Sequence, residues 1–227
     1  MKVNNFSKEE DFLDQLEHET VNFLNERVAR RGLALIGLSG GKTPGNFYLR
    51  LGENTSLPWE DLTFIQVDER FVDKTESRSN YNMLVKTLFA NNPGKNYIKY
   101  LRDFDTSLNY EDCIRSFLRM TSPLLEEGID LCILGIGKDG HFASIFPGTD
   151  LEDKRPVFGT ITEQFEVQKR MTLSASTILK SKKIFVLLKG KEKAGLVEKI
   201  KNSEVSNDFP ASLLKGHSDV TFYLLES

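Results

Sequence analysis

Short apolar runs of strand length recur along this chain, and most are apolar at nearly every position rather than at every second one. The clearest runs are Leu33–Leu38, Leu62–Val67, Leu131–Leu134, Ile184–Leu188 and Val220–Leu225. A strand that is apolar on both faces is typical of a parallel sheet covered by helices on both sides. The runs therefore predict an α/β protein with a three-layer αβα, Rossmann-like architecture around a mainly parallel sheet.

Amphipathic stretches between these runs predict the helices. Phe12, Leu16 and Leu24 recur at helical spacing between residues 8 and 31, and Gly32 follows as a stop. A second helix is expected where Thr43 would be the cap and Pro44 the first residue. The further predictions are helices from residue 79 or 80, over Asn109–Leu125 and in the stretch GKEKAGLVEKI, an edge strand over Tyr97–Leu101 and a weak strand over Val157–Ile161.

Composition excludes several classes of protein. No linker, repeat or low-complexity tract divides the 227 residues, so one domain over residues 1–227 is expected. The formal net charge of −3 gives no basic excess for nucleic acid, and no uncharged run is long enough to span a bilayer. The N-terminal residues resemble neither a signal nor a transit peptide, so a cytoplasmic location is expected. Cys113 and Cys132 are predicted to be buried free thiols, and the three histidines are too dispersed for a zinc motif.

Glycines and charged residues follow four of the apolar runs directly. SGGKT begins after Leu38, DER after Val67, GIGKDGH after Leu134, and KGKEK after Leu188. In open parallel sheets, ligands bind in a crevice outside the carboxyl ends of the strands. We therefore expect these motifs to face one crevice.

The SGGKT motif suits a phosphate group. Its backbone N–H groups, its hydroxyls and the N-terminus of the following helix all favour an anion. It resembles a P-loop, but three residues separate Gly37 from Gly41 where a P-loop requires four. A plain glycine turn between strand and helix is the alternative interpretation. The predicted phosphate-binding residues here are Ser39, Gly40, Gly41 and Thr43.

A phosphate dianion needs cations in addition to backbone dipoles. Arg170, which opens a Thr/Ser-rich segment, and Lys193 both flank predicted strand ends and are the candidates for this role. An ordinary surface charge is the alternative for each. Lys189 and Lys191 compete with Lys193, because spacing alone does not choose among the three lysines.

GIGKDGH combines a dinucleotide-binding pattern with residues that can transfer protons. Gly135 to Gly140 match GxGxxG, and Glu163 lies near the distance expected for a ribose-binding acid. A dinucleotide fingerprint needs a full helix, however, and Pro147 limits any helix here to a couple of turns. NAD binding is therefore a minor alternative. His141, with Asp139 two residues before it, instead predicts general acid–base chemistry.

The DER triplet at residues 68–70 has two interpretations. Three charged residues after a strand are commonly a solvated surface cluster. Their position directly after the apolar run that ends at Val67 favours the crevice instead. There Asp68 would be an acid near His141, and Arg70 would be a cation able to stabilise a developing negative charge.

Taken in order, the motifs SGGKTP, VDERFV, SNYNM, LGIGKDGHFASIFPG, RMTLS, GKEKA and FPASLL resemble those of the 6-phosphogluconolactonases. The resemblance runs from about Leu33 to the end of the chain. The wider group includes glucosamine-6-phosphate deaminases and ribose-5-phosphate isomerases. The resemblance implies a Rossmann-like three-layer fold and hydrolysis of 6-phosphogluconolactone to 6-phosphogluconate in the pentose phosphate pathway, with a small sugar phosphate as ligand and without a cofactor or a metal.

On this hypothesis some motifs bind the phosphate and others catalyse the hydrolysis. The 6-phosphate would bind at the 39–43 turn with Arg170 and Lys193, while neutral His141 would remove a proton from the attacking water. Asp139, or with less support Asp68, would orient the imidazole. Backbone N–H groups of the glycine turn or Arg70 would stabilise the oxyanion.

Two other functions stay open. Glucosamine-6-phosphate deaminases typically carry Asp-Glu-Tyr in place of DER and Asn-Glu-Pro after the Gly-His pair, whereas no acid lies between Ser144 and Pro147 here. That absence favours hydrolysis over ring opening. A non-catalytic sugar-phosphate sensor is the second alternative. The sequence leaves open whether the chain is a monomer or a dimer, which epimeric lactone it prefers, and what Lys42 does where lactonases more often have a small polar residue.

Overall fold

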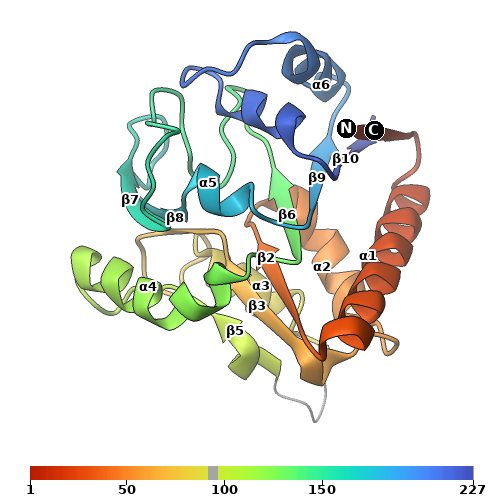
Figure 1. Cartoon of the computed structure of the whole chain (residues 1–227), viewed down its shortest axis with the longest axis horizontal. Coiled ribbons are helices and arrows are strands. Elements are labelled where there is room, and N and C mark those ends of the chain that lie inside the picture. The colour runs from red at the N-terminus through yellow and green to blue at the C-terminus, as the bar shows by residue number, and fades with distance from the viewer. Residues whose placement is uncertain (92–96, 227) are drawn as a thin grey trace.

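The computed structural model describes residues 1–91 and 97–226 and is built around a seven-stranded sheet (Figure 1). The strands lie in the order β1 (Lys2–Phe6), β10 (Val220–Leu225), β9 (Lys183–Lys189), β6 (Leu131–Gly135), β2 (Ala34–Leu38), β3 (Leu62–Gln66) and β5 (Leu101–Arg102). Each neighbouring pair in this order is parallel. The predicted mainly parallel sheet is therefore confirmed.

Helices cover both faces of this sheet, as the αβα prediction requires (Figure 1). One layer contains α1 (Glu9–Arg31), α2 (Lys42–Glu53) and α3 (Asn80–Lys86), and the other contains α4 (Tyr110–Glu126), α5 (Ala175–Ile178) and α6 (Lys193–Asn202). Short 3₁₀ helices lie at Trp59–Asp61, Tyr97–Tyr100 and Pro210–Gly216. No helix in the described parts of the chain has the length and apolar character needed to cross a membrane.

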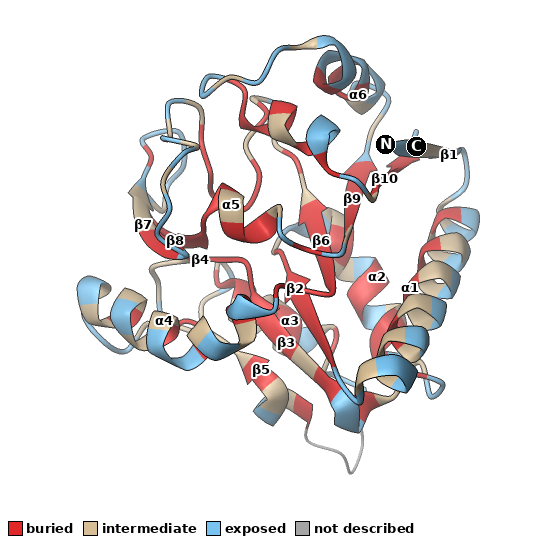
Figure 2. Cartoon of the chain, viewed as in Figure 1, coloured by how far each residue is buried: buried red, intermediate tan, exposed pale blue. Residues whose placement is uncertain are grey.

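The two cores lie on opposite faces of the sheet because successive side chains of a strand point to opposite sides. Leu35 packs with α4, α5 and α6, whereas its neighbour Ile36 packs with α1, α2 and α3. Figure 2 shows the central strands buried, while the outer faces of α1 and α4 are exposed. Both faces of the sheet are thus apolar, which explains the uninterrupted apolar runs in the sequence.

The chain order creates a switch point between β2 and β6. From β2 the sheet continues through β3 to β5 on one side, whereas from β6 it continues through β9 to β10 on the other. A crevice opens where neighbouring parallel strands lead to opposite sides. SGGKT leaves the carboxyl end of β2 and GIGKDGH leaves that of β6, so both motifs border this crevice.

A second, three-stranded antiparallel sheet contributes the other polar residues. It consists of β4 (Asp68–Arg70), β8 (Lys169–Leu173) and β7 (Val157–Ile161). The β4–β8 register places Asp68 opposite Thr172 and Arg70 opposite Arg170. The DER triplet is therefore a strand of its own, and the predicted weak strand at Val157–Ile161 is confirmed as β7.

Several boundaries differ from the predictions. Strand β1 was not predicted, because KVNNF is mostly polar and its strand conformation depends on pairing with β10. Residues 97–100 form a 3₁₀ helix rather than a strand, and only Leu101 and Arg102 pair with β3. Helix α6 begins at Lys193 rather than at residue 190.

The start of α2 also corrects a prediction. Its N-cap is Gly41, and no side chain caps the helix, so Thr43 lies inside the first turn and is not the cap. Pro44 is the third helical residue rather than the first. The glycine, with φ of +113°, lets the chain leave β2 and enter the helix directly.

Candidate active site

The switch-point crevice holds a cavity of about 250 Å³. Nine of the ten residues predicted to form the site line it: Ser39, Gly40, Gly41, Thr43, Asp68, Arg70, His141, Arg170 and Lys193. The tenth, Asp139, is hydrogen-bonded to His141. Five segments that are distant in sequence therefore meet at one cavity. Four of them follow a strand of the parallel sheet, as predicted, whereas Arg170 lies within β8.

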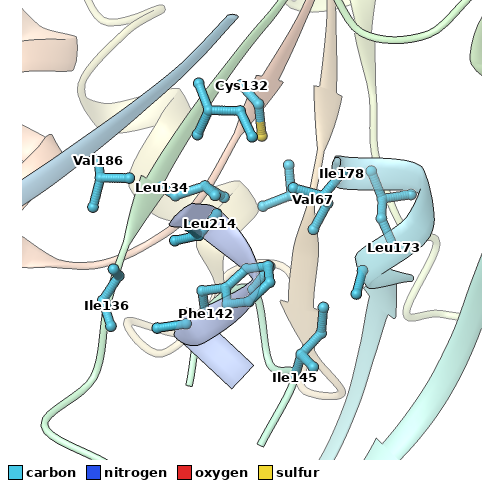
Figure 3. Packing of buried hydrophobic residues seen from close by; sticks show 14 of the residues in the cluster. Val67, Cys132, Leu134, Ile136, Phe142, Ile145, Leu173, Ile178, Val186 and Leu214 are labelled. Carbon is cyan, nitrogen blue, oxygen red and sulfur yellow. The ribbon is translucent and has the colours of Figure 1, made fainter. Parts of the chain in front are cut away.

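The turn that carries His141 is anchored in the hydrophobic core. Ile136, Phe142 and Ile145 flank the histidine and pack into the cluster between the sheet and the α4, α5 and α6 layer (Figure 3). Burying a side chain of this size contributes about 1.5–3 kcal/mol. The imidazole thus projects from a turn whose backbone is held on both sides.

Two glycines allow the turn to close. A Cβ at Gly137 would collide with the imidazole of His141, and one at Gly140 would collide with the ring of Phe209. Gly140 also has φ of +88°, a conformation that costs little for glycine. The glycines of GIGKDG therefore bring the backbone close to the histidine. Residues 141–148 contain no helix, so the structure does not support the NAD alternative.

His141 and Asp139 form a hydrogen-bonded pair. Oδ1 of Asp139 lies 2.6 Å from Nδ1 of His141 and also accepts a 3.2 Å hydrogen bond from the His141 backbone N–H. A carboxylate at Nδ1 keeps the proton on that nitrogen and leaves Nε2 with a free lone pair. Both side chains are about a quarter exposed, at 23% for His141 and 28% for Asp139. The pair therefore has the arrangement of a solvent-accessible general base.

Asp68 is bound to other partners. Its Oδ2 accepts a 2.5 Å hydrogen bond from the hydroxyl of Ser144, and its Oδ1 accepts a 3.2 Å bond from Nδ2 of Asn80. Ala143 and Ser144 both have positive φ, 47° and 55°, a strained conformation for residues other than glycine. Thr172 donates to the Ala143 carbonyl and Asp68 holds Ser144, so these two side chains stabilise the strained turn. Asp139, rather than Asp68, contacts the imidazole.

Glu69 has a structural position that the sequence did not reveal. It is 1% exposed and accepts hydrogen bonds from five donors. These are the side chains of Gln66 and Ser79 and the backbone N–H groups of Arg70, Asn80 and Tyr81. Burial raises the pKa of this carboxyl, against the effect of its hydrogen bonds. Glu69 thereby fixes the N-terminus of α3 to β4 and orders the wall of the cavity.

The turn before α2 has the features of an anion site. The first N–H groups of a helix lack partners within the helix, and the positive end of its dipole favours negative charge. Ser39 is buried, and its hydroxyl makes no hydrogen bond within the described residues. A Cβ at Gly40 would overlap the side chain of Asn80, so only glycine permits this close packing.

Two arginines face each other across the small sheet. Arg70 and Arg170 are directly opposite in the β4–β8 ladder, where like charges destabilise the pairing. Arg170 is 8% exposed, and burial together with the charge of Arg70 lowers its pKa. Nη1 of Arg70 donates to the Arg78 carbonyl at 2.6 Å. An anion between the two guanidinium groups would relieve their repulsion.

The structure separates the three candidate lysines. Lys193 lines the cavity and donates from Nζ to the Ile136 carbonyl at 2.8 Å. Lys189 also lines the cavity, but its Nζ lies 3.1 Å from the Glu9 carboxylate. Lys191 is exposed and does not line it. Lys193 therefore has the best placement of the three, and Lys42, which carries no assigned role, lines the same cavity.

Four buried polar groups in or next to this cavity lack a hydrogen-bond partner in the described parts of the chain. Three of these groups belong to residues that line the cavity and the fourth to Asp139 beside His141. The atoms without a partner within the described residues are Ser39 Oγ, Arg70 Nε, Asn80 Oδ1 and Asp139 Oδ2. A buried polar group without a partner costs about 1–3 kcal/mol, which a ligand or water can recover. Within the described ranges, no three His, Cys, Asp or Glu side chains converge as metal ligands would.

The fold and the site together define an α/β protein with an anion site and an acid–base pair at a topological switch point. A sequence profile of the family described as "Glucosamine-6-phosphate isomerases/6-phosphogluconolactonase" matches residues 7–223. The chain therefore belongs to this family, which confirms the resemblance found in its motifs.

Both activities of the family occur among similar proteins. The probable 6-phosphogluconolactonase of Dictyostelium discoideum is 31% identical over 205 residues, which cover 88% of this chain and 86% of that protein. Glucosamine-6-phosphate deaminase 1 of Bacillus subtilis (strain 168) is 28% identical, with coverage of 92% and 91%. The crystal structure of 6-phosphogluconolactonase from Thermotoga maritima has a TM-score of 0.86 at 25% identity and covers 99% of both chains. A monomeric glucosamine-6-phosphate deaminase has a TM-score of 0.83 at 28% identity, covering 100% and 97%.

Proposed function

We propose that this protein is a 6-phosphogluconolactonase that hydrolyses 6-phosphogluconolactone to 6-phosphogluconate. The observation that carries the proposal is the His141–Asp139 pair beside a cavity that also contains Arg70, Arg170 and Lys193. A general base and a group of cations are what hydrolysis of a phosphorylated lactone requires.

The phosphate would bind where the cations and the α2 N-terminus meet. Ser39, Gly40, Gly41 and Thr43 supply hydroxyl and backbone donors on one side of the cavity. Arg170 and Lys193 supply positive charge, and the position of Arg70 opposite Arg170 supports a place for Arg70 in the same group. Arg70 would then act mainly on the phosphate rather than on the oxyanion, because its charge is most needed beside a dianion.

His141 would act first as a base and then as an acid. Nε2 removes a proton from water while the water oxygen forms a bond to C1, and the carbonyl electron pair moves onto the carbonyl oxygen. When the intermediate collapses, the bond between C1 and the ring oxygen breaks, and His141 returns the proton to that oxygen. The new carboxylic acid then releases a proton to solvent. Water is consumed and the enzyme ends in its starting protonation state.

Asp139 would hold the imidazole in the required tautomer and stabilise its cation during the reaction. Asp68 would act indirectly, through the Ser144 hydroxyl and the strained turn after His141. Gly137 and Gly140 already donate their N–H groups within their own turn, so these two groups would not be free to stabilise the oxyanion.

The deaminase is the second candidate, because proteins with that name are 28% identical over nine-tenths of this chain. Ring opening needs an acid near the histidine. Ile145 and Phe146 are buried hydrophobic residues in the segment where the deaminases carry a glutamate, and the ring of Phe146 packs 4.9 Å from the imidazole. This apolar contact supports hydrolysis over deamination.

Three measurements separate the functions. Freshly generated 6-phosphogluconolactone is added at constant pH, and acid release is measured against the spontaneous rate. Release above that rate supports the lactonase. Ammonia release from glucosamine 6-phosphate would instead establish the deaminase, and binding of 6-phosphogluconate without turnover of either compound would establish a sensor.

A further inference from the structure

Phe165 is an exposed aromatic residue in contact with the site. It lies in the segment that joins β7 to β8, and 39% of its surface is exposed. The segment closes through a 3.0 Å hydrogen bond from the Thr162 N–H to the Gln168 carbonyl, and the Gln164 N–H donates to the Thr162 hydroxyl at 3.2 Å. The position of Phe165 is therefore defined by its own hairpin.

The ring of Phe165 touches both functional parts of the cavity. Its centroid lies 5.6 Å from that of the His141 imidazole, with the rings at 77°, an edge-to-face arrangement. The guanidinium carbon of Arg170 lies 4.8 Å from the same centroid, within the range of a cation–π contact. One side chain thus contacts the proposed base and the proposed phosphate-binding cation.

Phe146 makes the same two contacts from the protein interior. Its centroid lies 4.9 Å from the imidazole and 5.7 Å from the guanidinium carbon of Arg170, and 5.8 Å from the ring of Phe165. The two phenylalanines therefore hold both polar groups between aromatic rings. Phe146 is buried, so its removal would leave a cavity, whereas Phe165 borders open solvent and can be truncated without one.

We propose that Phe165 is a positioning residue that fixes the His141 imidazole and the Arg170 guanidinium relative to each other. This inference rests on the proposed lactonase function. Binding of the phosphate determines where C1 lies, so the distance from Arg170 to His141 sets the approach of water to the carbonyl. A displacement of about 1 Å can cost about 100-fold in rate, which makes a contact that fixes this distance valuable.

The positioning role of Phe165 depends on the face of its aromatic ring rather than on the volume of its side chain. A leucine can fill similar space, but it has no quadrupole to attract the guanidinium or to meet the imidazole edge. A tyrosine keeps the ring and can place its hydroxyl in solvent. The variants F165L and F165Y therefore separate packing from ring chemistry, and I161A removes a more exposed hydrophobic side chain from the same hairpin as a matched control.

The test measures kcat and KM for the lactone and the Kd for 6-phosphogluconate in F165A, F165L, F165Y and I161A. F165A and F165L are expected to lower kcat/KM about tenfold, with a lower kcat and a higher KM, and to weaken product binding several-fold. F165Y and I161A are expected to stay within about twofold of the wild type. Thermal unfolding is measured for each variant, and unchanged midpoints assign the losses to positioning.

The inference is overturned if F165A matches the wild type, if F165L performs as well as F165Y, or if I161A loses as much as F165A. If the wild type does not hydrolyse the lactone, the proposed function fails separately, and the 6-phosphogluconate binding series still decides the contact with Arg170. Equal affinity of F165A and F165Y for 6-phosphogluconate would then reject a role of Phe165 in positioning Arg170. Weaker affinity in F165A alone would support that role.

Discussion

The two ends of the parallel sheet handle buried charge in opposite ways. At the amino end of β6, Asp130 is fully buried and its carboxylate accepts four hydrogen bonds. Nε and Nη2 of Arg27 donate at 2.9 and 2.5 Å, Nη1 of Arg31 at 3.3 Å, and the Leu35 N–H at 2.9 Å. This network ties α1 to the start of β2 and β6.

At the carboxyl end, polar groups are buried without complete pairing. Arg170 is 8% exposed beside a second arginine, and the Ser39 hydroxyl lacks a partner among the described residues. Removing one partner of a fully paired buried charge destabilises the fold, whereas a buried polar group with incomplete hydrogen bonding favours a ligand that completes it. Burial of a charged group therefore does not by itself identify a ligand-binding site. Incomplete hydrogen bonding of a buried polar group is the more informative observation. Variants at the two ends should therefore separate stability from activity.

The largest expected effect is that of His141→Ala. Removing a general base typically costs about 10²- to 10⁴-fold in rate, so kcat should fall by that factor. Binding of 6-phosphogluconate and thermal unfolding should change little, because the imidazole is partly exposed. His18→Ala, an exposed histidine on α1, is the control. Turnover near the wild-type rate in the His141 variant would reject the assigned base.

Asp130→Ala should lower the stability of the protein and leave its activity unchanged. It leaves Arg27 and Arg31 without their shared carboxylate, so the free energy of unfolding should fall by about 3 kcal/mol. Urea unfolding measures the loss, with the exposed Asp208→Ala as the control. The folded fraction should keep the wild-type kcat/KM. A large loss of activity with unchanged stability would contradict the proposed contrast between the two ends.

Arg170→Met should lower kcat/KM by roughly 30-fold, since a hydrogen bond to a charged group contributes about 1.5–3 kcal/mol. Stability without ligand should change little, because the substitution relieves the repulsion from Arg70 but also removes a hydrogen bond to the Val167 carbonyl and contacts with two phenylalanine rings. Steady-state kinetics and thermal unfolding test both parts, with the exposed Arg155→Met as the control. Marked destabilisation without ligand would show that Arg170 serves the fold.

The smallest effect concerns pH. Burial lowers the pKa of Lys193, so its ammonium loses the proton at a lower pH than an exposed lysine. Affinity for 6-phosphogluconate should therefore weaken as pH rises through that lowered pKa, since the attraction disappears with the charge. Lys193→Arg should move this weakening to higher pH, because arginine keeps its charge up to about pH 12. Calorimetric titration at increasing pH measures it, and the exposed Lys191→Arg should leave the profile unchanged.

Much of the fold was predictable because its determinants are local. Continuous apolar runs identified β2, β3, β6, β9 and β10, and helical spacing identified α1 and α4. Strand β1 and the 3₁₀ helix at Tyr97–Tyr100 were not predicted correctly. The first depends on pairing with β10, and the second has strand-like composition but pairs only at its end.

Most residues of the candidate site were also accessible from sequence, because all except Arg170 belong to motifs that follow an apolar run. The role of each of these residues was harder to predict from the sequence. The sequence left Asp139 and Asp68 as competing partners of His141, and the structure places Asp139 on the imidazole and Asp68 on Ser144. Phe165 carried no local signal, since an aromatic residue in a polar loop has no periodicity to interpret.

The sequence by itself determined the parallel α/β architecture, because a strand that is buried on both faces shows this in its own run of apolar residues. Only the tertiary structure placed Arg70 opposite Arg170, since that contact joins residues a hundred positions apart through the antiparallel register of β4 and β8. Register depends on which strands meet and in what direction, and the pattern of a single strand does not specify either.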